Sequence, residues 1–65
     1  MNTAEQVIED IAETEADAVT ACLNMAELVS RFTTRQGVES VEVFVFEDGS
    51  SINVFADRVT SANPF

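Results

Sequence analysis

The sequence predicts one small α+β domain in which a long N-terminal helix, residues 3–35, precedes an antiparallel β-hairpin, residues 38–58. Three observations predict it. Neither glycine nor proline occurs before Gly37, apolar residues recur at the helical spacing as far as Phe32, and strict alternation follows. Residues 59–65 are expected to form a flexible C-terminal tail.

The predicted helix has a start signal, a continuous polar stripe and a stop signal. Thr3 and Gln6 have the spacing of a capping box. The polar stripe keeps one helical phase as far as Arg31, where Glu27 and Arg31 form a favourable pair one turn apart. Gly37 is a natural stop.

The alternative is a kink or short break near Thr14. The run Thr14-Glu15-Ala16-Asp17 resembles a second capping box, with an acid three residues after a threonine. The unbroken phase favours one continuous helix.

The hairpin follows from alternation around an Asp48-Gly49 pair, the dipeptide typical of a two-residue type I′ turn. That turn would place Val45 opposite Ile52, whereas a four-residue turn would place Phe44 opposite Phe55. The face expected to pack against the helix comprises Val41, Val43, Val45, Ile52 and Val54.

Helix and hairpin differ in length, and this mismatch predicts a homodimer. A helix over residues 4–33 is about 45 Å long, whereas a seven-residue strand spans about 24 Å. The N-terminal half of the helix would therefore have no partner within the chain, although it is apolar on one side. The oligomer interface favoured by this mismatch is helical and comprises Ile8, Ile11, Val19, Cys22 and Leu23. The alternative is that two hairpins join by their edges or their phenylalanine faces into one larger layer.

The charge predicts the kind of partner. The chain has a net charge of −9, and residues 1–17 hold six acids and no base. This balance argues against binding nucleic acid or an anionic membrane. The acidic N-terminal segment has two interpretations: solubility for a small chain with apolar surface elsewhere, which is favoured, and a surface complementary to a basic partner. The predicted partner-binding residues are acids along the helix and the outward phenylalanines of the hairpin: Glu9, Glu13, Asp17, Phe44, Phe46 and Phe55.

Residues suited to catalysis are scarce, so no catalytic, metal or cofactor site is expected. Histidine, lysine and tyrosine are absent, and Cys22 is the only cysteine. The function expected is a non-enzymatic interaction module, a regulator or inhibitor; the alternative is a homodimeric structural module without a separate ligand. The acidic N-terminal segment does not resemble a signal peptide, which predicts the cytoplasm, or the host cytoplasm if a virus encodes the chain.

Overall fold

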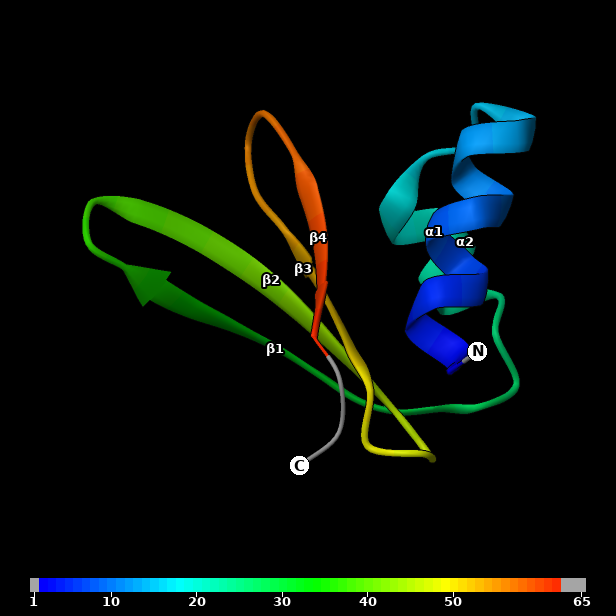
Figure 1. Cartoon of the computed structure of the whole chain (residues 1–65). Helices are drawn as coiled ribbons and strands as arrows, with labels where there is room; N and C mark the ends of the chain where they lie inside the picture. The colour runs from blue at the N-terminus through cyan, green and yellow to red at the C-terminus, as the bar shows by residue number, and fades with distance from the viewer. Residues whose placement is uncertain (1, 63–65) are drawn as a thin grey trace.

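The computed structural model describes residues 2–62 and shows two short helices packed on one side of a four-stranded antiparallel sheet (Figure 1). The strands follow one another in the order β1-β2-β3-β4. The α+β class is thus confirmed, but the single helix over 3–35 followed by a hairpin is wrong. The elements are α1 (Thr3–Thr14), α2 (Ala18–Leu23), β1 (Leu28–Gln36), β2 (Glu39–Phe46), β3 (Ser51–Val54) and β4 (Val59–Ala62).

The helical segment breaks at Glu15, which adopts a left-handed conformation with φ of 56°. Asp17 then caps α2, because its side chain accepts a hydrogen bond from the amide of Thr20. At the other end, Asn2 rather than Thr3 caps α1 by accepting from the amide of Glu5 at 2.9 Å. The break lets α1 and α2 fold against each other, so the overhang that predicted a dimer does not exist.

The second half of the predicted helix is strand β1. Its β-branched and aromatic residues, among them Val29, Phe32 and Thr33, favour an extended backbone. The expected helical pair of Glu27 with Arg31 is replaced by an ion pair between Arg31 and Glu42 of β2, at 3.4 Å.

Gly37 stands in a hairpin turn instead of ending a helix. It opens the two-residue loop between β1 and β2 with φ of 64°, a conformation that glycine adopts readily.

The loop between β2 and β3 is one residue longer than predicted. Phe46 donates its amide proton to the carbonyl of Ser50, and Gly49 closes the three-residue loop with φ of 86°. Phe44 therefore pairs with Ile52, and neither the predicted Val45–Ile52 register nor the four-residue alternative occurs.

The core lies on the phenylalanine side of the hairpin. Phe44, Phe46 and Ile52 are fully buried against the helices, so the prediction that the valine face covers the helix is wrong. The helical partners in this core are Ala4, Val7 and Cys22.

A polar contact fixes the start of α1 to the β2–β3 loop. Asp48 accepts hydrogen bonds from the amide of Thr3, at 2.8 Å, and from the amide and hydroxyl of Ser50. The buried Ser50 hydroxyl in turn accepts from the amide of Ala4 at 3.1 Å. These bonds hold the pKa of Asp48 well below its usual range, with the Ser50 hydroxyl as the largest cause.

The helices pack chiefly on the β3–β4 side of the sheet, and the β1–β2 hairpin projects beyond them (Figure 1). A shallow hollow of about 270 Å³ remains on the helix side of the projecting part. It is lined by Val19, Thr33, Ser40, Glu42, Val54, Phe55 and Ala56.

Strand β4 occupies most of the segment predicted as a flexible tail, so that prediction is wrong for residues 59–62. The remainder of the predicted tail, residues 63–65, lies outside the described residues.

Candidate functional site

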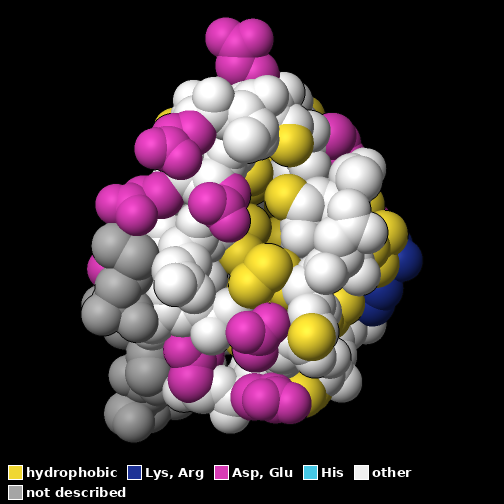
Figure 2. Space-filling view, turned by 90° about the vertical axis from the view of Figure 1, so that its right-hand side faces the viewer, with side chains coloured by type: hydrophobic (Ala, Val, Ile, Leu, Met, Phe, Trp, Pro, Cys, Tyr) yellow, Lys and Arg dark blue, Asp and Glu magenta, His cyan; other side chains and the backbone are white. Residues whose placement is uncertain are grey.

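The outer side of α1 forms an acidic surface. Glu5, Glu9 and Glu13 follow one another at intervals of four residues, which places them on one side of the helix. With the exposed Asp10 and Glu15 they make up what we call the acidic helix surface. Figure 2, which looks onto the helix side, shows acidic side chains on both sides of an apolar band and basic side chains only at one edge.

No basic residue balances this surface. Arg31 and Arg35 lie on β1, and Arg58 immediately precedes β4. Within residues 2–62, every ion pair joins Arg31 or Arg58 to a carboxylate of Glu39, Glu42 or Asp57. The carboxylates of the acidic helix surface therefore produce an uncompensated negative potential on one side of the molecule.

The predicted acidic binding residues divide into two groups. Glu9 and Glu13 are exposed on α1, as their positions on the polar stripe indicated. Asp17 instead caps the start of α2, since its carboxylate accepts hydrogen bonds from the amide and hydroxyl of Thr20 at 3.0 and 3.2 Å.

The predicted aromatic binding residues are mostly inside the molecule. Phe44 and Phe46 are fully buried in the core, so neither can form part of a binding surface in this fold. Phe55 is half-buried, and the Arg58 guanidinium lies 3.9 Å from the centre of its ring.

The predicted oligomer interface is largely used within the chain. Cys22 is fully buried, whereas Ile8, Ile11 and Val19 are half-buried and pack against the core. Only Leu23 of this set is exposed, at 46% of its surface.

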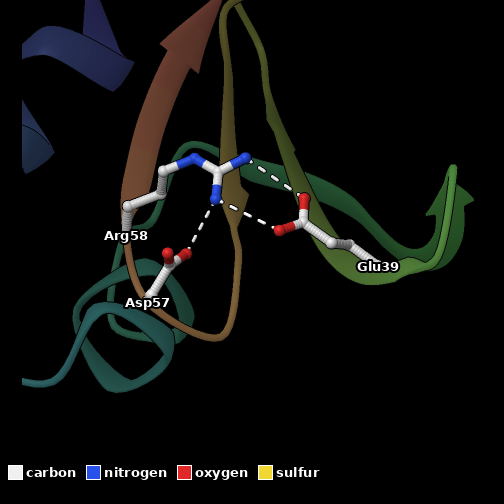
Figure 3. Close-up of polar contacts among 3 residues, drawn as sticks. All are labelled: Glu39, Asp57 and Arg58. Carbon is white, nitrogen blue, oxygen red and sulfur yellow. Dashed lines mark hydrogen bonds and ion pairs between the residues drawn. The ribbon is translucent and has the colours of Figure 1, made fainter.

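Arg58 forms a clamp that the sequence pattern did not reveal. Its guanidinium donates two hydrogen bonds to Glu39, at 3.1 and 3.3 Å, and one to Asp57 at 2.7 Å (Figure 3). These bonds, first of all those to Glu39, raise the pKa of Arg58. The clamp connects the start of β2 to the β3–β4 turn, on the side of the sheet where Val41 is fully buried.

The described residues include one thiol, that of the buried Cys22. Burial, reinforced by the nearby charge of Asp17, raises the pKa of the Cys22 thiol to about 11, so it is protonated at neutral pH. Within residues 2–62, no three side chains of the metal-binding types gather into a site. No helix of this part of the chain is long and apolar enough to cross a membrane.

Sequence reasoning missed the exposed strand β1, which carries two of the three arginines and no acid. The β-branched residues Val29, Thr33 and Thr34 were the available signal. Comparisons with known protein families, with curated proteins and with solved structures find no match for this chain.

Proposed function

We propose that the chain is an acidic protein-interaction module that docks on a basic surface of a larger protein. The observation that supports this proposal is the segregation of charge. Five exposed carboxylates of the acidic helix surface lack an ion-pair partner within residues 2–62, while all three arginines lie on β1 or next to β4 and none on a helix. Such an arrangement attracts cationic partners from one direction.

The positions of these acids also favour a role beyond the fold. Glu5, Glu9 and Glu13 repel one another at a spacing of four residues. Glu13 and Glu15 place negative charge at the C-terminal end of α1, where the helix dipole disfavours it. A neutral surface would therefore make α1 more stable, and binding a basic partner would relieve this repulsion.

Surfaces that bind nucleic acid are the basic surfaces best matched to such a module. They present arginine and lysine side chains to a row of phosphates, and the carboxylates of the acidic helix surface offer a comparable row of negative charge. In this proposal the chain acts as a regulator or inhibitor that occupies the basic surface in place of the nucleic acid.

The test compares two charge-reversed variants with the native chain. Glu9→Lys/Glu13→Lys alters the acidic helix surface, and Glu27→Lys/Glu47→Lys changes the net charge equally beside β1 and β2. Partners captured from the source cell by the native chain are purified, and association with each variant is followed at several salt concentrations.

We expect the first variant to associate about tenfold or more slowly at low salt, with a weaker salt dependence. The control variant should resemble the native chain. Equal association rates for all three proteins, or a captured partner with an acidic contact surface, would contradict the proposal.

The alternative function, a homodimeric structural module, is supported by a different observation, the open edge of β1. A dimer formed there would leave the acidic helix surface free, so the two functions are compatible.

A further inference from the structure

Strand β1 is an open edge of the sheet. It pairs with β2 on one side only, and none of its nine residues is buried. The opposite edge, β4, has four residues and packs against α1. A long, unprotected edge strand is a template for pairing with another strand.

The hairpin geometry fixes which backbone groups of β1 are free to pair. Gln36 and Glu39 close the two-residue loop, so they form a hydrogen-bonded pair, and such pairs alternate along the ladder. Phe32 and Thr34 accordingly direct their amide and carbonyl groups to β2. The backbone groups of Arg31 and Thr33 point away from the sheet, and no other strand within residues 2–62 pairs with them.

This pattern suits pairing of β1 with itself about a two-fold axis. Phe32 is the middle residue of the strand Leu28–Gln36, so an antiparallel arrangement centred there places β1 alongside its counterpart, with residues 30–34 of the two copies directly opposed. The free backbone groups of Arg31 then face those of Thr33 from the second copy. Phe32 faces Phe32 of the second copy in a non-hydrogen-bonded pair, where side chains approach most closely.

The charges on β1 favour both contact between two copies at this strand and the register centred on Phe32. The chain carries −9 overall, but β1 contains Arg31, Arg35 and no acid, so two copies repel each other least when they meet here. The register centred on Phe32 places Arg31 opposite Thr33, whereas a centre on Arg31 or Thr33 would place arginines directly opposite each other. The acidic helix surface lies on α1, which packs against β3 and β4. It therefore lies outside the proposed contact between the two copies of β1.

The exposed apolar side chains agree with this arrangement. Phe32 is 50% exposed and shares the side of the sheet opposite the helices with its ladder partner Val43. Pairing about Phe32 would extend this apolar row across both copies. In the register centred on Phe32, residues 35 and 36 would oppose residues 29 and 28, so the bulge between Leu28 and Ser30 limits regular pairing to residues 30–34 of each strand.

We propose that β1 is a homodimer interface, in which two copies join antiparallel about Phe32 to form a continuous eight-stranded sheet. A strand pair is a small interface, so we expect a dissociation constant on the order of 10 µM. The proposal does not depend on the proposed function, because its readout is the oligomeric state of the isolated protein.

The first test is sedimentation equilibrium of the native chain, Phe32→Lys and Val38→Lys over a range of concentrations. Val38 is 92% exposed in the β1–β2 loop, so its replacement controls for loss of an apolar side chain and gain of a charge. We expect native and Val38→Lys dimers at about 100 µM and a Phe32→Lys monomer, weakened about 100-fold by lysines facing each other. Circular dichroism establishes that both variants fold.

The second test is oxidative cross-linking, which reports the register. Cα atoms of a non-hydrogen-bonded pair lie about 4.5 Å apart, within the range a disulfide spans, so Phe32→Cys should cross-link the dimer. Thr34→Cys, which lies opposite Ser30 in this register, should not, and the native Cys22 is buried. A native chain that is monomeric at about 100 µM, a dimer unaffected by Phe32→Lys, or equal cross-linking of both cysteine variants would overturn the proposal.

Discussion

Strands β1 and β2 are neighbours in the same hairpin, yet they occupy different environments. Phe44 of β2 is fully buried under the helices, while Phe32 of β1, one row away in the ladder and on the opposite side of the sheet, is half exposed. The helices cover the sheet from β2 to β4 and leave β1 with a single neighbouring strand. Different parts of this small domain therefore provide stability and a surface for interaction. The part covered by the helices, β2 to β4, which we call the covered half, supplies the core, and β1 supplies an open edge.

The largest expected effect comes from removing the same side chain in each half. Phe44→Ala should destabilise the domain by about 3–5 kcal/mol, because it opens a cavity in the core beneath the helices. For a domain of this size that loss is sufficient to unfold it. Phe32→Ala should lower the free energy of unfolding by about 1 kcal/mol, because half of the ring is already in water.

Urea unfolding followed by circular dichroism measures the free energy of unfolding of both variants. The protein concentration is kept below the dissociation constant of the proposed dimer. Similar losses for the two phenylalanines would mean that β1 belongs to the core.

A second pair of variants compares two serines. Ser50→Ala should reduce the free energy of unfolding by about 1–3 kcal/mol, since the buried amide of Ala4 loses its acceptor. Ser30→Ala, on the exposed strand β1, should be nearly neutral. Urea unfolding of both variants is the measurement, and a neutral Ser50→Ala would show that the contact between α1 and the β2–β3 loop adds little.

A third change should increase the stability of the covered half. Glu15→Gly relieves a left-handed backbone and removes a charge from the C-terminal end of α1, so we expect a gain of about 1 kcal/mol. Ala16→Gly is the control, because that residue has no positive φ and gains only freedom in the unfolded chain. Thermal unfolding compares them, and destabilisation by Glu15→Gly would mean that the Glu15 side chain makes a stabilising contact.

The smallest expected effect is a pH dependence specific to Asp48. Its pKa is lower in the folded than in the unfolded chain, so its contribution to stability is complete above an unfolded pKa of about 4. That contribution is lost as the pH falls below this value, and the stability difference between the native chain and Asp48→Asn should shrink accordingly. Asp10→Asn controls for the loss of one charge, and a difference that stays constant down to pH 2 would contradict the assignment.

Part of this fold could be predicted from the sequence. The α+β class and the strand character of β2 and β3 follow from residue patterning. The sequence pattern predicts a helix over β1 because polar residues there continue the helical phase of α1, and Glu27 and Arg31 have a helical spacing. Tertiary pairing with β2 outweighs that local pattern, since it satisfies the backbone and suits the β-branched residues Thr33 and Thr34.

The face and register of the hairpin could not be read from alternation alone. Both sides of β2 are apolar, with Val41 and Val43 on one and Phe44 and Phe46 on the other. The loop is three residues because Gly49 takes the left-handed position after Asp48, a choice that the Asp-Gly pair leaves open.

Only part of the candidate site could be predicted from the sequence. Glu9 and Glu13 are acids on a polar stripe, and exposure followed from that pattern. The capping role of Asp17 depends on the break at Glu15, and the burial of Phe44 and Phe46 depends on the face. Neither is a property of the local sequence.

Residue-resolved amide hydrogen exchange of the native chain and of Phe32→Lys, at the same concentration of about 100 µM, tests the central claim most directly. The amides of Phe44 and Ile52 should exchange slowly in both proteins. Those of Arg31 and Thr33 should exchange rapidly in the variant and slowly in the native dimer, while Thr34 remains protected in both. Slow exchange of Arg31 and Thr33 in both proteins, or rapid exchange in both, would contradict an open β1 edge that a second copy covers.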